Sequence, residues 1–318
     1  RGDNMKGTTL ISIIIPVYNE EKSIPIFLKY IKPIIDREPY TFELIFIDDG
    51  STDQSLNELL EAQKNNDQIK IVELSRNFGK ELAMAAGFQE ATGDAVIPMD
   101  VDLQDPPELI SIFLRKWETG YDVVTGVRRL RKEDSLFKRS SATYFYFIFK
   151  WLCNTPMIPN AGDYRLMDRK VVDALNNLPE RVRFTKGLYA WLGFSQTCIE
   201  YDRPARVMGK TSWKIWGLWN FAIDGITSFS TFPLRIWSYL GICIAIFGFL
   251  YAFIVFTKTL IFGIDVPGYP SMMVVILVLG GLILTSLGII GEYIGRIFME
   301  VKKRPLYIIK NRIGFHAK

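Results

Sequence analysis

The chain has 318 residues, 49% of them hydrophobic, and a formal net charge of +4, which is too small to indicate a nucleic-acid partner. Its one histidine, His316, excludes most catalytic triads and histidine-ligated metal sites, and the widely spaced Cys153, Cys198 and Cys243 support neither a disulfide framework nor a zinc cluster. Any catalysis must therefore depend on carboxylates and basic side chains, with or without a hard metal ion.

The first 130 residues alternate short β-branched runs with helical patterns. We expect strands at residues 11–15, 42–47, 69–74, 95–99 and 122–125, and helices at residues 23–35, 53–63, 80–91 and 106–118. This alternation predicts an α/β fold with a mostly parallel sheet that is covered by helices on both faces. Ligands of such sheets bind beyond the carboxyl ends of the strands, so the residues that follow each strand are the first candidates for a site.

Acidic segments follow three of the predicted strands. They are Pro16-Val-Tyr-Asn-Glu20, Asp48-Asp-Gly-Ser-Thr52 and Asp100-Val-Asp-Leu-Gln-Asp-Pro-Pro107. In an extended segment Asp100 and Asp102 face the same side and Gln104 continues the row, so their oxygens could bind one Mg²⁺ or Mn²⁺ ion. The alternative is a solvated acidic loop. The sequence contains neither GxGxxG nor GxxxxGK[ST], which removes the main support for a dinucleotide site or a P-loop.

Two apolar runs follow in the second half of the chain, at residues 236–256 and 272–290, and neither contains a charged side chain. Each is about as long as the roughly 20 residues that a membrane-spanning helix needs, and two buried core helices are the alternative. Basic residues flank the pair at Lys210, Lys214 and Arg235 before it and at Lys302, Lys303 and Arg304 after it. We therefore expect an integral membrane protein with both ends in the cytoplasm.

Two further stretches, at residues 136–152 and 213–226, have helical patterns that combine aromatic and basic side chains. We expect them to lie at the membrane interface, with helices packed on the sheet as the alternative. Gly291 and Gly295 are spaced for close helix contact, although Glu292 lies between them. A homo-oligomer that forms through the second span is therefore a hypothesis.

The acidic segments, together with Asn77-Phe-Gly79 and Asn160-Ala-Gly-Asp-Tyr-Arg-Leu166, resemble the signature blocks of family 2 glycosyltransferases with the GT-A fold. Within that family the chain is most similar to polyprenyl-phosphate glycosyltransferases, namely the dolichyl-phosphate mannose synthases and the GtrB-like bactoprenol glucosyltransferases. The resemblance covers nearly the whole chain. It implies a GT-A domain at residues 5–210, juxtamembrane amphipathic helices at 211–233, two transmembrane helices within 234–298 (spans at about 236–256 and 272–292) and a cytoplasmic tail at 299–318.

The resemblance also implies a role for individual residues on the donor side. Pro16, Tyr18, Glu20 and Asp48 would hold the uracil and ribose, and Asp100 would lie on the sugar or ribose side. Asp102 and Gln104, with Asp100, would hold the Mg²⁺ or Mn²⁺ that bridges the diphosphate. For Asp48 a helix cap is the alternative, and for Tyr18 a core position.

One block departs from the family pattern R-x-x-G-x-S-K. The chain has Arg206-Val-Met-Gly-Lys-Thr-Ser212, so Ser212 occupies the usual lysine position. Arg206 and Lys210 are then the donor-side candidates, with Lys210 supplying the charge from a neighbouring position.

On the acceptor side, Arg128, Arg139 and Thr143 match family positions that bind the lipid phosphate, with an ordinary basic loop as the alternative for Arg128. Asp163 matches the candidate base. A phosphate monoester has a second pKa of about 6, so it needs little help from a base, and Asp163 could equally orient the phosphate or pair with Arg165.

The resemblance thus implies inverting transfer of a hexose, with glucose favoured, from a UDP-sugar to undecaprenyl-type or dolichyl-type polyprenyl phosphate. GDP-mannose is the alternative donor. We expect this at the cytoplasmic face of a membrane, with the bacterial inner membrane favoured. Two rival functions remain: a processive polysaccharide synthase, which lacks support because no Q-x-x-R-W occurs, and a non-catalytic membrane protein that binds a nucleotide-sugar.

Overall fold

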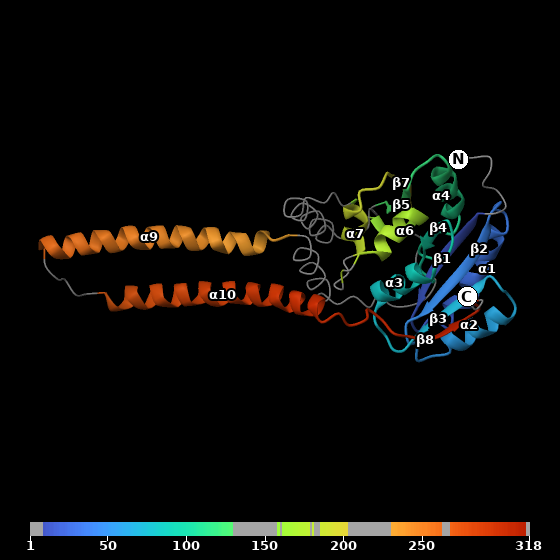
Figure 1. Cartoon of the computed structure of the whole chain (residues 1–318), viewed down its shortest axis with the longest axis horizontal. Coiled ribbons are helices and arrows are strands. Elements are labelled where there is room, and N and C mark those ends of the chain that lie inside the picture. The colour runs from blue at the N-terminus through green and yellow to red at the C-terminus, as the bar shows by residue number, and fades with distance from the viewer. Residues whose placement is uncertain are drawn as a thin grey trace.

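The computed structural model describes residues 9–129, 158–159, 161–178, 180, 185–202, 230–262 and 268–315. These residues form an α/β domain from which two long helices project side by side (Figure 1). The helical stretches that we expect at residues 136–152 and 213–226 lie outside the described residues.

The alternation of strands and helices expected in the first 130 residues is confirmed. The strands are β1 (Leu10–Val17), β2 (Thr41–Asp48), β3 (Ile69–Leu74), β4 (Ala95–Pro98) and β5 (Val123–Arg128). The helices between them are α1 (Ser23–Ile35), α2 (Ser55–Lys64), α3 (Lys80–Glu90) and α4 (Leu109–Glu118). Most boundaries agree within three residues, because the apolar runs that mark the strands end at clear turn residues.

The remaining described elements are β6 (Ala161–Asp168), α6 (Arg169–Asn176), α7 (Thr185–Trp191), β7 (Gln196–Tyr201), α9 (Phe232–Phe262), α10 (Tyr269–Val301) and β8 (Ile309–Ile313). All eight described strands form one sheet in the order β7-β5-β6-β4-β1-β2-β3-β8. The four strands β4, β1, β2 and β3 are parallel, whereas β6 and β8 run antiparallel to their neighbours. The sheet is therefore mostly parallel, as expected.

The strand register explains where ligands can reach this sheet. Val17 pairs with Asp48, and Ile14 pairs with Pro98, so β1, β2 and β4 end along the same edge. Because β6 runs in the opposite direction to β4, its first residues lie at this edge too. We call it the carboxyl edge. All three acidic segments follow strands that end here.

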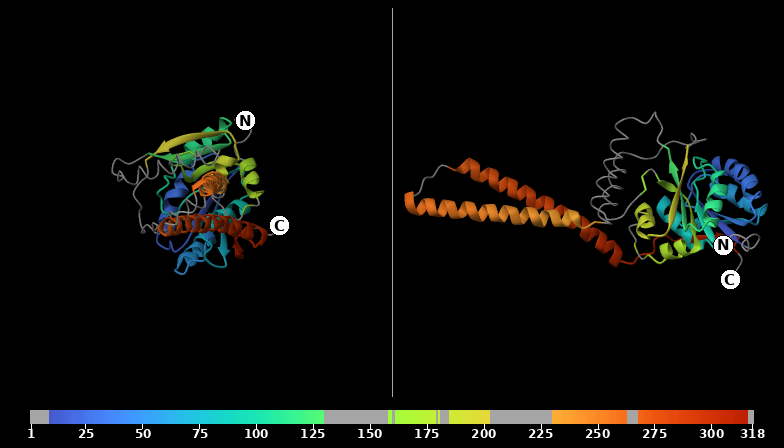
Figure 2. Two further views of the ribbon diagram at one scale, coloured as in Figure 1. Left: turned by 90° about the vertical axis from the view of Figure 1, so that its left-hand side faces the viewer. Right: turned by 90° about the horizontal axis from the view of Figure 1, so that it is seen from above.

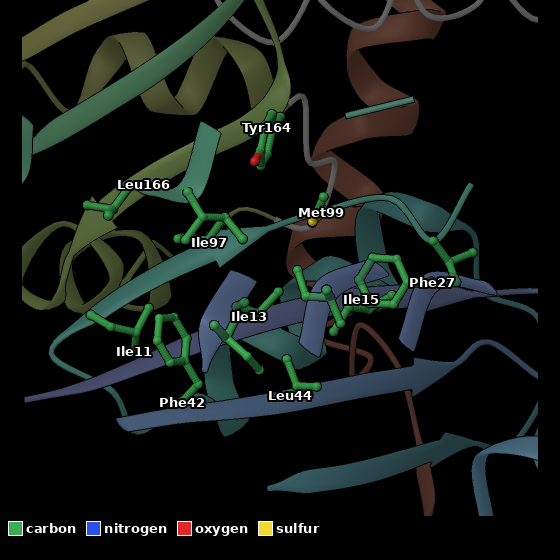
Figure 3. Close-up of a cluster of buried hydrophobic side chains, with 14 of the residues drawn as sticks. Ile11, Ile13, Ile15, Phe27, Phe42, Leu44, Ile97, Met99, Tyr164 and Leu166 are labelled. Carbon is green, nitrogen blue, oxygen red and sulfur yellow. The ribbon is translucent and has the colours of Figure 1, made fainter. Parts of the chain in front are cut away.

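Apolar side chains fill both faces of the sheet. On one face, side chains of β1, β2, β4 and β6 form one cluster that also contains Phe27 of α1 (Figure 3). On the other face, Ile14 and Ile45 pack with residues of α3, α6 and α7. The alternate residues of β1 thus serve two cores, which is why Ile11 to Ile15 form a nearly unbroken apolar run.

The two long helices are apolar and exposed. Windows in each of them, Leu234–Tyr251 in α9 and Val278–Val301 in α10, are long and apolar enough to cross a membrane by length and composition. The expected spans at 236–256 and 272–292 fall within these helices. Figure 2 shows both helices extending away from the α/β domain. The Tyr293 hydroxyl of α10 donates to the carbonyl oxygen of Ser230, just before α9, over 2.7 Å.

A strand that the sequence did not predict follows α10. β8 pairs with the edge of β3, and the backbone N–H of Ser75 donates to the Ile308 carbonyl oxygen over 2.9 Å. Lys310 Nζ lies 2.5 Å from Glu73 Oε1, and Arg312 forms two hydrogen bonds with Glu90, of 3.0 and 2.8 Å. The segment at 299–318, which we expected to be only a tail, thus contributes to the sheet of the N-terminal domain.

Candidate functional site

Two loops at the carboxyl edge are tied to each other. Asn19 adopts a positive φ of 55°, a conformation that asparagine tolerates better than most residues. Its backbone N–H donates to Ser51 Oγ over 3.0 Å, and its side-chain oxygen accepts from the N–H of Thr52 over 2.8 Å. The N–H of Glu20 donates to Ser55 Oγ over 2.7 Å. The loops after β1 and β2 therefore form a single surface.

The predicted donor-side residues of β1 and β2 lie on or beside this surface. Pro16 is half-buried in β1, whereas Tyr18 is 46% exposed, so the alternative of a core tyrosine is wrong. Glu20 accepts a hydrogen bond of 2.5 Å from Ser23 Oγ at the start of α1.

Asp48 is buried at the end of β2 and accepts from the N–H of Ser51 over 3.2 Å. The helix-cap alternative for Asp48 is also wrong, because Asp53 accepts from the N–H of Ser55 at the start of α2. Burial raises the pKa of Asp48, and the nearby Glu73 adds to this effect.

A third loop is held against the second by Asp49 and Gly50. The buried Asp49 carboxylate accepts from the backbone N–H groups of Phe78 and Gly79, over 2.7 and 2.9 Å. Gly50 has a φ of 69°, and a Cβ there would lie 2.5 Å from the carbonyl carbon of Arg76. Only glycine allows this approach of two backbones. The contact places the start of α3, and with it Lys80, at the carboxyl edge.

Lys80 joins two of the predicted site residues. Its Nζ lies 2.6 Å from Asp100 Oδ1 and 3.2 Å from Asp163 Oδ2. Asp100 follows β4, and Asp163 lies near the start of β6, so the antiparallel arrangement of these strands brings the two carboxylates to one place. Burial alone would lower the pKa of Lys80, but Asp100 and Asp163 outweigh it and raise the pKa above its usual value.

Asp163 is held in its ionised form. Burial alone would raise its pKa, but Lys80, Lys186 and Arg165 together lower the pKa to about 2. Its ion pair is with Lys80, whereas Arg165 donates to the Gly162 carbonyl oxygen over 2.7 Å and stacks 3.8 Å from the centre of the Tyr189 ring. The other carboxylate oxygen of Asp163, Oδ1, is buried without a hydrogen-bond partner in the part of the chain that the structure describes.

Glu81 lies near Asp163, and its pKa is shifted in the opposite direction. Burial and the charge of Asp163 raise its pKa to about 7, although Thr185 donates a hydrogen bond to its carboxylate. Two neighbouring carboxyl groups thus have pKa values on opposite sides of the usual range, which is a common property of functional sites.

The predicted metal ligands lie in the loop after β4. This loop is not the extended segment that we expected, because Val101 and Asp102 form a turn and Leu103 has a φ of 57°. Asp102 Oδ1 accepts from the N–H of Gln104 over 3.1 Å. Among the described residues no group of three or more His, Cys, Asp or Glu side chains could hold a metal ion.

Two carboxylates and an amide oxygen nevertheless fit Mg²⁺ or Mn²⁺, since Mg²⁺ typically uses one or two carboxylates and takes its other ligands from water and substrate phosphates. These three side chains therefore suit a metal ion that binds together with a diphosphate.

Arg128, the predicted phosphate ligand, is fixed by two residues of the carboxyl edge. Its Nε donates to the Tyr201 hydroxyl over 3.1 Å, and its NH2 group lies 3.5 Å from Asp105 Oδ1. The Tyr201 hydroxyl in turn donates to Asp105 over 2.7 Å. Asp105 is buried, which raises its pKa. Arg128 is therefore an oriented cation at the end of β5 and not a free member of a basic loop.

The other predicted residues, Arg139, Thr143, Arg206 and Lys210, lie outside the described residues. Sequence reasoning missed three residues that the structure brings to the site: Lys80, Glu81 and Asp105. Two signals could have found them. Asp105 belongs to the acidic segment after β4, and Lys80 follows the Asn77-Phe-Gly79 block directly.

Comparison with known proteins shows which families the chain matches. The model of glycosyl transferase family 2 matches residues 12–175, and the model of the GtrB C-terminal hairpin matches residues 232–297. An uncharacterized glycosyltransferase of Synechocystis sp. is 50% identical to the chain over 96% of each protein. A bactoprenol glucosyl transferase of Shigella phage SfX is 46% identical over 95% of this chain and 99% of that protein.

Among solved structures, glucosyl-3-phosphoglycerate synthase from Mycobacterium tuberculosis, in complex with Mn²⁺, UDP-glucose and phosphoglyceric acid, is similar at a TM-score of 0.46. It shares 18% identity over 69% of this chain and 78% of that one. The sheet, the acidic carboxyl edge and the two matched models lead to one assignment: the chain belongs to glycosyl transferase family 2 and carries a GtrB C-terminal hairpin.

Proposed function

We propose that the chain transfers a hexose, with glucose favoured, from a UDP-sugar to a polyprenyl phosphate of the undecaprenyl or dolichyl type. The observation that carries this proposal is the ion-pair cluster of Asp100, Lys80 and Asp163, in which one ammonium group joins the carboxylate that we assign to the donor side and the one that we assign to the acceptor side. Similarity to bactoprenol glucosyl transferases over nearly the full length supports the choice of lipid and sugar.

The donor half of the reaction would use the loops after β1, β2 and β4. Tyr18 is exposed where a uracil ring could stack on it, and the Asp48 carboxylate could accept from uracil or ribose. Asp100, Asp102 and Gln104 would hold Mg²⁺ or Mn²⁺, which when bound neutralises the charge that builds up on the departing UDP. Arg206 and Lys210 stay donor-side predictions.

The acceptor half needs an oriented phosphate more than a base. A polyprenyl phosphate with a second pKa of about 6 is largely a dianion at neutral pH, so its oxygen can attack the anomeric carbon directly. Asp163 is ionised, and we assign it the orientation of the phosphate and its cationic partners. Arg128, with Arg139 and Thr143, would bind the phosphate. As the new bond forms, the bond to UDP breaks, so the configuration at the anomeric carbon inverts.

The arrangement of the C-terminal half supports a membrane location for this reaction. α9 and α10 are apolar, exposed and consecutive in the chain. After α10 the chain returns to the sheet of the α/β domain, where β8 pairs with β3. Two spans that start and finish at one domain require both ends on the same side. We infer that this is the cytoplasmic side, where nucleotide-sugars are made, and that the membrane is a bacterial inner membrane.

The test is transfer itself. Purified protein is incubated with undecaprenyl phosphate, Mg²⁺ or Mn²⁺, and either radiolabelled UDP-glucose or radiolabelled GDP-mannose. We expect label from UDP-glucose to enter the organic phase as a lipid that carries one hexose. A product with many hexoses would favour the processive synthase, and nucleotide binding without any product would favour the non-catalytic alternative.

A further inference from the structure

Lys80 lies between two carboxylates of the proposed site. It is the first residue of α3 and follows Gly79, whose backbone N–H is held by Asp49. Its ammonium group lies between Asp100 on the donor side and Asp163 on the acceptor side. The side chain is still 42% exposed, so an incoming molecule can reach it.

The stability of the fold is a weak reason for this arrangement. An ion pair of such exposure contributes about 0–1 kcal/mol, because water screens the charges and the long side chain loses freedom. The charges around Lys80 instead indicate a role in binding an anionic substrate. Glu81 and Asp105 lie close enough to influence the same ammonium group, so Lys80 offsets the negative charge of several carboxyl groups at once. Without Lys80 an incoming phosphate dianion would meet stronger repulsion from these carboxylates.

The donor capacity of the lysine is only partly used. A lysine ammonium has three N–H donors, and Lys80 directs its ammonium at two carboxylates. Within the part of the chain that the structure describes, a third N–H is thus left for an anionic oxygen. Asp163 Oδ1, buried without a hydrogen-bond partner among the described residues, shows that this group is also incompletely satisfied. Both features would be expected where a substrate group completes the network.

We propose that Lys80 is a catalytic residue of the transfer: its ammonium group keeps Asp100 and Asp163 around one cation and donates its third N–H to a phosphate oxygen that arrives between them. This assignment rests on the proposed function. The oxygen belongs either to the acceptor monophosphate or to the diphosphate of the donor. Lys80 remains an ammonium throughout, since the acceptor oxygen bonds to the anomeric carbon while UDP leaves with the electron pair of the broken bond.

The chain offers a matched control for Lys80. Lys170 is also near the start of a helix, α6, and its Nζ lies 2.5 Å from Asp122 Oδ1. Its side chain is 47% exposed, close to the value for Lys80. Asp122 directly precedes β5, whereas Arg128 ends it, so this ion pair lies at the opposite edge of the sheet. Lys170→Met therefore removes a comparable ion pair far from the site.

The experiment compares wild type, Lys80→Met, Lys80→Arg and Lys170→Met in the transfer assay, with thermal unfolding and calorimetric binding of UDP with Mg²⁺. We expect Lys80→Met to lower kcat about 100-fold or more, the scale for loss of one well-placed electrostatic group. Lys80→Arg should recover part of this loss because it keeps the charge. Lys170→Met should retain the wild-type kcat, and both methionine variants should unfold within a few degrees of wild type.

The binding measurements identify the source of the phosphate oxygen. A higher KM for polyprenyl phosphate with unchanged UDP affinity assigns it to the acceptor, and weaker UDP binding assigns it to the donor. Equal kcat for wild type and Lys80→Met overturns the assignment of Lys80, as does a loss of kcat that arginine does not relieve and that accompanies a large fall in melting temperature. Absence of product from wild type overturns the proposed function and this assignment with it.

Discussion

The carboxylate of Asp49 accepts a hydrogen bond of 2.9 Å from the backbone N–H of Gly79. Through this contact the end of β2 determines where α3 starts. We predict that Asp49→Ala destabilises the protein by about 1–3 kcal/mol, because two N–H groups lose their acceptor. Sugar transfer should also slow, because Lys80 follows Gly79 directly and would lose its fixed position. Thermal unfolding and kcat measure the two effects, and Asp67→Ala, in the exposed loop before β3, should change neither.

Replacement of Asp102 tests the metal assignment. Asp102→Asn keeps the size of the side chain but removes one anionic ligand, so the ion that accompanies the diphosphate should bind more weakly. We expect transfer to fall on the order of 100-fold with Mg²⁺ or Mn²⁺. Calorimetry should show a parallel loss of metal-dependent UDP binding. Activity near that of wild type in this variant, or in wild type with a chelator, would remove Asp102 from the proposed site.

Replacement of Arg128 should weaken the use of the acceptor lipid and leave binding of the nucleotide unchanged. Arg128→Ala should weaken the use of polyprenyl phosphate by about 1.5–3 kcal/mol, or roughly ten- to a hundredfold, which is usual for a charged hydrogen bond. Arg128→Lys should recover only part, because lysine lacks the planar donor fork. Metal-dependent UDP binding should persist.

The neighbouring Arg129 is the control for Arg128. It is 58% exposed and pairs with Glu200 over 3.2 Å, so Arg129→Ala should leave acceptor use close to that of wild type. Equal losses in the two alanine variants would mean that the basic residues of this segment act together. A joint loss of UDP binding and acceptor use in Arg128→Ala would place Arg128 in the donor site or in the fold.

The pKa of Glu81 predicts a pH-dependent stability. Burial and Asp163 raise this pKa from 4.5 to about 7 in the folded protein. Between these values the folded state binds more protons than the unfolded state, so the free energy of unfolding decreases as pH rises from about 4.5 to 7. Glu81→Gln removes this dependence and can still accept from Thr185. The melting temperature of the variant relative to wild type should therefore be higher at pH 8 than at pH 5. The same difference at both values would show that Glu81 titrates normally.

The proposed topology predicts which cysteines an impermeant maleimide can reach. Lys258 is exposed near the far end of α9, and Asp67 is exposed in the α/β domain. In a background where Cys153, Cys198 and Cys243 are serine, Lys258→Cys should react in intact cells. Asp67→Cys should react only after permeabilisation. The reverse pattern would place the α/β domain outside and remove the cytoplasmic donor site.

The first half of the fold could be predicted because local sequence patterns mark its strands. β1 contains four isoleucines and is buried on both faces, so its apolar run marks the strand without knowledge of its neighbours. β6 gives no such signal. It is mostly buried although it carries Asp163, Arg165 and Asp168, because Lys80, Tyr189 and Trp117 from other elements contact these side chains. Its burial depends on contacts that no local pattern contains.

The sequence predicted several residues of the site, but only part of their arrangement in space. The acidic strand ends indicated Asp48, Asp100 and Asp102, because in a parallel sheet the carboxyl ends of strands share one edge. The expected extended row after β4 was wrong, since the positive φ of Leu103 turns the chain there. Lys80 could not be predicted from periodicity, because a lysine at the start of a helix is usually solvated. Its role depends on the backbone contact between Gly50 and Arg76.

The pairing of β8 with β3 has a consequence for how the protein is made. Translation proceeds from the N-terminus, so the first four strands of the sheet leave the ribosome long before Ile309 to Ile313. Until then one side of β3 exposes unpaired backbone groups, and an open edge of this kind promotes aggregation. The edge closes only after α9 and α10 have been synthesised and, if they span the membrane as we propose, inserted. Completion of the sheet is therefore one of the last steps of folding, and a chain that ends before Ile309 would keep this edge of β3 open.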